Sequence, residues 1–180
     1  MIITYKECIE KYKNDYTIKQ KLKENTIYQI SKGLYSTETN PSELEIITVK
    51  YPRAVFAGET AFYFHGLTDV IPERYTLATR RTDTRINHDR IEQIFMLDRI
   101  FDKGITYMDR NHISIRIYSP ERMLVELVRF KMKWPYDYYK EIIGSFRREI
   151  DSMDFGLVEE YTALFSNGQH LMEIIDLEVL

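Results

Sequence analysis

The sequence has one cysteine, seven glycines and no long apolar run. Since Cys8 has no partner, no disulfide can form within the chain, and we expect a reducing cytoplasm as its location. No stretch of about 18 apolar residues occurs, and the first residues lack the basic-then-apolar pattern of a signal peptide, so we expect no membrane association. The few glycines form neither a phosphate-binding loop nor a dinucleotide fingerprint, so no cofactor is expected.

The remaining composition is that of a folded protein. The length of 180 residues fits one domain, or a small module with a larger one, and 44% hydrophobic with 29% charged residues is ordinary for globular chains. Fourteen tyrosines and nine phenylalanines indicate a core built with aromatic rings whose hydroxyl ends reach water.

Charge is unevenly distributed along the chain, whose net charge is −3. Residues 1–36 carry seven lysines and four acidic residues, a net charge of +3, and the rest therefore carries −6. A basic head followed by an acidic body favours anion binding by the head. A solvated helix face rich in lysine explains the same pattern without a ligand.

The local patterns in the head predict two helices and a hairpin. Apolar spacing indicates helices over 3–12 and 16–24, and a hairpin over 27–36 turns at Gly33, which tolerates a positive φ. Ile18 and Leu22 share the inward face of the second helix. This order is the outline of a winged helix-turn-helix.

The rest of the chain predicts a mixture of helices and strands. Helices are indicated over 42–50 and 54–65, strands over 75–79, 93–97, 105–109 and 113–118, and helices from Ser119-Pro120 onward and over 136–150, 154–165 and 168–180. The predicted fold class is α+β. Residues 1–38 would form the winged-helix-like head, and 39–180 a domain with a small, mostly antiparallel sheet packed with helices and a helical tail.

The candidate DNA-binding residues are polar or basic and lie on the second helix and at the hairpin turn: Lys19, Gln20, Lys23 and Lys32. Lysine and glutamine donate to base edges and phosphates, and a helix fits the major groove. A homodimer would supply further basic contacts. The alternative is a solvated amphipathic helix that binds nothing.

No pattern favours an enzyme. Glu59 and His65 are six residues apart, which places them on different helical faces, and Asp69 follows the helix end, so we expect structural roles and no metal. A second acidic group lacks the strand spacing of a metal-dependent nuclease: Asp83, Asp89 and Glu92. A basic group could clamp phosphates or form a solvated loop: Arg80, Arg81 and Arg85.

Three segments, taken in order, resemble the AbiEi-type antitoxins of the AbiE abortive-infection, type IV toxin–antitoxin systems. They are residues 30–35 (ISKGLY), 60–69 (TAFYFHGLTD) and 119–126 (SPERMLVE), and the resemblance covers about residues 4–165. It implies a non-enzymatic protein that represses its own operon through a winged helix. Lys19, Gln20, Lys23 and Lys32 correspond to the family's DNA-contacting elements. Family members usually carry one more helix before residues 3–12.

The resemblance also implies a functional partner, a nucleotidyltransferase-like toxin that the C-terminal domain neutralises without a stable complex. A second hypothesis is a protein-interaction module. Its shortened head no longer binds DNA, and it acts on its partner through the aromatic-rich C-terminal domain. A third is a small nuclease, which the sequence does little to support.

Overall fold

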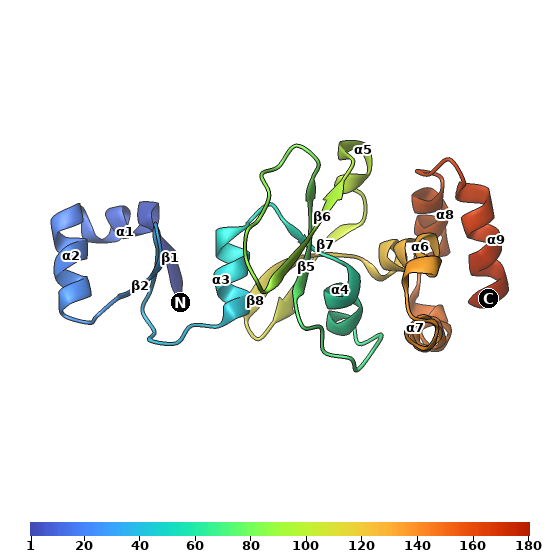
Figure 1. The fold of residues 1–180 in the computed structure, drawn as a ribbon, viewed down its shortest axis with the longest axis horizontal. Helices are drawn as coiled ribbons and strands as arrows, with labels where there is room; N and C mark the ends of the chain where they lie inside the picture. The colour runs from blue at the N-terminus through green and yellow to red at the C-terminus, as the bar shows by residue number, and fades with distance from the viewer. The chain divides into compact units, whose positions relative to one another are not determined.

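The computed structural model describes residues 1–180 and divides the chain into two units (Figure 1). The first unit contains residues 1–53 and 111–113, and the second 54–110 and 114–180. This division after residue 53 lies later in the chain than the predicted boundary at residue 38. Helix α3 (Glu43–Lys50) belongs to the head because it packs on strand β1 (Ile2–Thr4), where the Glu45 carboxylate accepts the Ile2 N–H at 2.9 Å.

The head contains the two predicted helices and the predicted hairpin, preceded by a strand that was not predicted. Along the chain β1 is followed by α1 (Tyr5–Tyr12), α2 (Asp15–Lys23), β2 (Tyr28–Ser31) and β3 (Leu34–Ser36). The strands form an antiparallel sheet in the order β1-β3-β2, with β1 paired along β3. Three residues are too few to show strand alternation, so β1 is defined only by its pairing.

Both helices of the head begin at side-chain caps. Thr4 and Glu7 form a capping box, in which the Thr4 hydroxyl accepts the Glu7 N–H and the Glu7 carboxylate accepts the Thr4 N–H at 2.7 Å. Lys13, with φ of 71°, ends α1. Asn14 then caps α2 by accepting the Thr17 N–H at 2.9 Å. These caps fix where α2 begins, and thereby which of its side chains face outward.

A small cluster holds the head together. Ile3, Cys8, Ile18, Ile27 and Tyr35 are buried in it, and three partly buried side chains pack against them: Ile9, Tyr12 and Leu22. The inward face predicted for α2 is thus confirmed. β1, α1, α2 and β3 contribute, together with Ile27 just before β2, so the hairpin and α2 share one core.

The second unit is built on a five-stranded sheet in the order β6-β5-β4-β8-β7. Its strands are β4 (Val55–Phe56), β5 (Tyr75–Arg80), β6 (Ile91–Met96), β7 (Ile105–Arg110) and β8 (Ile113–Tyr118). β4 runs antiparallel to β5, whereas β4–β8 and β5–β6 are parallel pairs. The two-residue connection between β7 and β8 makes that pair antiparallel. The expectation of a mostly antiparallel sheet is therefore wrong: the sheet is mixed, because residues 81–90 return the chain so that β6 starts beside the start of β5.

The helix predicted over 54–65 is wrong in its first four residues. Val55 and Phe56 form β4, and the helix α4 covers only Gly58–Phe64. Gly58 has φ of 51°, outside the right-handed helical region, and Val55 pairs with Ala78 of β5. This pairing joins residues far apart in sequence, so no local pattern predicts it.

The remaining helices of the second unit are α5 (Asp98–Phe101), α6 (Pro120–Arg129), α7 (Tyr136–Arg148), α8 (Phe155–Thr162) and α9 (Gly168–Glu178). Short 3-10 turns occupy Lys131–Lys133 and Ile150–Ser152. α6 packs on α4, α8 and α9, and its position among the C-terminal helices is visible in Figure 1. As predicted, Ser119 caps α6 and Pro120 lies in its first turn. The α+β class is confirmed, and none of the helices is both long and apolar enough to span a membrane.

Candidate nucleic-acid interface

A groove of about 680 Å³ lies on the head between α2 and the β2–β3 hairpin. Lys19 enters it from α2, and Lys32 from the hairpin turn. The other lining residues are Tyr5, Asp15, Ile18, Leu22, Gln29, Gly33 and Tyr35. Two lysines that are 13 positions apart in the sequence thus reach the same hollow, as an anion site requires.

The hairpin turn is held in place by the first turn of α1. Gly33 has φ of 78°, which lets β2 reverse into β3, and its carbonyl oxygen accepts the Tyr5 N–H at 2.8 Å. An added Cβ at Gly33 would lie 3.9 Å from the Tyr5 Cβ, so space is not the constraint there; the backbone conformation is. Lys32, next to Gly33, is exposed and makes no ion pair.

The structure brings Lys19 and Lys32 together and places Lys23 and Gln20 outside the groove. Lys23 is exposed one turn after Lys19 on α2, where it extends the basic surface along the helix. Gln20 donates from Nε2 to Glu24 Oε1 at 3.0 Å. Lys21 donates to the other oxygen of Glu24 at 2.9 Å, and this bond lowers the pKa of the Glu24 carboxyl. Gln20 is therefore already engaged on its own helix.

Three lining residues were not predicted from the sequence. Tyr5 comes from the start of α1 and Gln29 from β2, and neither belongs to the helix face or turn that the pattern indicated. Asp15 accepts the Tyr5 hydroxyl at 3.1 Å, and this hydrogen bond raises the pKa of Tyr5. The acidic Asp15 at one side of the groove makes the lysine side the natural place for a phosphate.

His65 has a structural role, as its position at a helix end predicts. Its Nε2 lies 2.7 Å from the Tyr118 carbonyl oxygen, so Nε2 carries the hydrogen and donates it, as expected for a core-edge histidine. Burial lowers the pKa of His65. No three His, Cys, Asp or Glu side chains are grouped closely enough to hold a metal ion.

The arginines at the end of β5 divide into two kinds. Arg80 is the last residue of β5 and does not belong to the loop. Its guanidinium pairs with Asp98 at 3.7 Å and with Asp102, and it stacks over Phe101. Asp83 accepts the Arg80 N–H at 3.0 Å, which closes the turn after the strand. Arg81 and Arg85 remain exposed on the connection, as the solvated-loop interpretation predicts.

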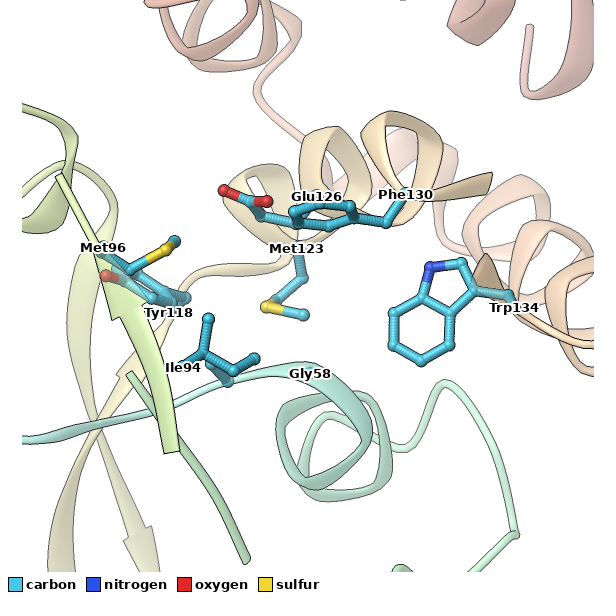
Figure 2. A pocket seen from close by; sticks show the side chains of 9 residues that line it. Gly58, Ile94, Met96, Tyr118, Met123, Glu126, Phe130 and Trp134 are labelled. Atoms are coloured by element: carbon cyan, nitrogen blue, oxygen red, sulfur yellow. The ribbon is translucent and has the colours of Figure 1, made fainter. Parts of the chain in front are cut away.

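A cavity in the second unit is too small and too apolar for catalysis (Figure 2). It measures about 40 Å³ and lies between α4, β6 and α6. Met123 and Trp134 point into it, whereas the Glu126 carboxylate is turned away and accepts hydrogen bonds from Arg122 and Arg129. The cavity is a packing gap beside a buried ion pair.

Comparison with known proteins does not identify a family for this chain. No protein-family model matches the chain, and no curated protein matches it either.

Proposed function

We propose that this chain is a DNA-binding regulator of the AbiEi antitoxin type, and that its head contacts DNA through the groove between α2 and the hairpin. The observation that carries the DNA-binding proposal is the convergence of Lys19 and Lys32 on that groove. α2 would lie in the major groove, and Lys32 would reach a flanking phosphate. Lys23 would add a further phosphate contact along α2.

The topology of the head supports a winged helix. Two helices separate β1 from the hairpin, and the hairpin strand β3 lies between β1 and β2. This arrangement places the β2–β3 turn beside the exposed face of α2, because both pack on the same cluster around Ile18 and Tyr35. A helix with an adjacent basic turn is the geometry that a wing needs in order to contact the backbone of DNA.

The test is DNA binding by the full chain, measured by fluorescence anisotropy with a labelled duplex of about 30 base pairs, three helical turns, from the region upstream of its gene. We expect the double variant Lys19→Ala, Lys32→Ala to lose about tenfold or more in affinity at low salt. The slope of the logarithm of its binding constant against the logarithm of the salt concentration should be smaller by about 1.8, since each phosphate contact contributes about 0.9. The matched control is Lys6→Ala, Lys11→Ala, which removes the same charge from α1, outside the groove.

Equal losses in the two double variants would show that only net charge matters and would contradict the proposed groove. Absence of wild-type binding at about 50 mM salt, where phosphate contacts are strongest, would instead favour the interaction module without DNA binding. Two observations favour that alternative: Asp15 lines the groove, and Gln20 is bonded to Glu24.

The antitoxin part of the proposal rests on the resemblance of residues 30–35, 60–69 and 119–126 to AbiEi-type antitoxins. It assigns neutralisation of a nucleotidyltransferase-like toxin to the second unit. Co-expression of the full chain with the toxin encoded next to it should restore growth. The Lys19→Ala, Lys32→Ala variant should restore growth equally well if neutralisation and DNA binding are separate, and a failure of the wild type to protect would reject the antitoxin role.

A further inference from the structure

A second groove, of about 240 Å³, lies on the second unit between the segment after α4 and the start of α7. Its lining combines apolar and acidic side chains: Glu59, Val70, Ile71, Pro72, Glu73, Pro135 and Tyr138. It is separate from the lysine groove of the head, and nothing in the proposed DNA contact uses it.

The apolar part of this groove faces water. Ile71 is 71% exposed and Val70 is 52% exposed, although both are large apolar side chains. The segment that carries them is fixed, because the Thr68 hydroxyl donates to Glu141 at 2.7 Å and accepts the Val70 N–H at 3.1 Å. A fixed backbone that presents apolar side chains to solvent is typical of a binding surface.

The acidic part carries charge that no cation in the chain neutralises. Neither Glu59 nor Glu73 forms an ion pair or a hydrogen bond. Partial burial, together with the neighbouring carboxylates of Glu92 and Glu73, raises the pKa of Glu59. An anionic ligand would be repelled here, whereas a cationic group would relieve the repulsion between these carboxylates.

Tyr138, which lines the groove, also has an unused hydrogen-bonding group. The Tyr138 hydroxyl is buried and has no hydrogen-bond partner. Burial and the nearby Glu59 and Glu141 carboxylates raise the pKa of Tyr138, so the hydroxyl keeps its proton and can donate. Tyr138 is held in place by its ring contacts with Phe62 and Trp134, at centroid distances of 6.5 and 5.8 Å. A buried donor without a partner is costly, and a ligand that accepts its hydrogen bond would remove this cost.

We propose that this groove binds a protein segment in which an arginine or lysine stands next to a large apolar side chain. The cation lies between Glu59 and Glu73, the apolar side chain covers Ile71 and Val70, and a backbone carbonyl of the segment accepts the Tyr138 hydroxyl. Charge complementarity selects this occupant, because the groove combines exposed apolar side chains with unpaired carboxylates. The proposal stands independently of DNA binding by the head.

The experiment is an NMR titration of the full ¹⁵N-labelled chain with the peptide acetyl-Ala-Leu-Arg-Leu-Ala-amide, with acetyl-Ala-Leu-Glu-Leu-Ala-amide as the control peptide. We expect saturable shift changes confined to residues around 59, 70–73 and 135–138 for the arginine peptide, and none for the glutamate peptide. Glu59→Gln, Glu73→Gln should weaken the arginine peptide at least fivefold. Glu10→Gln, Asp176→Asn removes the same charge at two exposed positions outside the groove and should bind as the wild type does.

Three results would overturn the proposal. The first is equal binding of the two peptides, and the second is equal weakening in the two double variants. The third is self-association of the chain, seen by sedimentation and lost in Ile71→Ser, which would assign the groove to a second copy. Circular dichroism of each variant distinguishes a lost contact from a lost fold, and Ile71→Ser in a folded monomer should still weaken the arginine peptide.

Discussion

Arg122 and Glu126 lie one turn apart on α6, and Arg122 Nη2 is 2.6 Å from Glu126 Oε1 in the interior of the second unit. Arg122 is fully buried. Glu126 also accepts two hydrogen bonds from Arg129, at 2.9 and 2.7 Å, so one carboxylate pairs with two guanidinium groups. Glu126 is thus the only acidic side chain that pairs with the buried Arg122.

Removal of Glu126 should therefore destabilise the second unit strongly. We expect Glu126→Ala to lower the free energy of unfolding by about 3–5 kcal/mol, because it leaves a buried guanidinium charge without a partner. Urea unfolding followed by Trp134 fluorescence measures this change. The double variant Arg122→Met, Glu126→Leu removes both charges and should recover much of the loss; a double variant no more stable than Glu126→Ala would contradict the explanation by charge.

Gly104 and Gly66 both have a positive φ but differ in the space around them. An alanine at each position therefore separates the effect of the backbone from that of the neighbouring atoms. Their φ angles are 78° and 73°, so alanine at either position costs about 1–2 kcal/mol from the backbone alone. At Gly104 a Cβ would also lie 2.6 Å from the Arg122 Cβ, whereas at Gly66 nothing lies within 4 Å. Gly104→Ala should thus lower the unfolding free energy clearly more than Gly66→Ala does, and equal losses in urea unfolding would show that the space at Gly104 is not the constraint.

His65 should make the second unit less stable at mildly acidic pH. Burial lowers the pKa of His65 in the folded state below its ordinary value, so its contribution to stability is present above about pH 6.5 and is lost as the pH falls through the folded pKa. We expect the unfolding free energy of the wild type to fall as the pH drops below about 6.5, the ordinary histidine pKa. His65→Gln keeps a donor for the Tyr118 carbonyl and should show a smaller fall; an identical pH dependence would exclude His65 as the cause.

Cys8 reports on opening of the head. The side chain is fully buried in the cluster of α1 and α2, and burial raises the pKa of its thiol, so it should react slowly with a thiol reagent at about pH 7.5. The reaction rate of Cys8 with Ellman's reagent in the native chain should be roughly 100-fold or more below that in urea, since reaction requires local opening. The proposed binding of the head to DNA would slow it further, and a native rate close to the unfolded one would mean that the head opens readily.

Local signals in the sequence predicted the elements that local chemistry defines. The Ser119-Pro120 start of α6, the Gly33 turn and the inward face of α2 all depend on residues within one or two turns. Strands β1 and β4 were missed because each is defined by hydrogen bonds to distant segments, such as Val55 with Ala78. The parallel pairing of β5 with β6 was missed for the same reason.

Local signals likewise predicted only part of the candidate site. Lys19 and Lys32 follow from a helix face and a turn, and the structure brings them to one groove. Gln20 was placed with them, but it is bonded to Glu24, which lies one turn further on the same helix. The acidic groove of the second unit combines Glu59 with Tyr138, 79 positions later, so only the folded chain shows it.

The hydrogen bond from the Tyr5 N–H to the Gly33 carbonyl has a consequence for affinity. It joins the tip of the hairpin to the first turn of α1, and through α1 to the buried Cys8. The backbone beneath Lys32 is therefore already ordered before any ligand arrives, and only the lysine side chain loses freedom on contact. In the proposed DNA contact, a rigid tip of this kind would keep the entropic cost of binding to about 0.5–1.5 kcal/mol for that side chain, whereas a flexible loop would add the cost of ordering several residues.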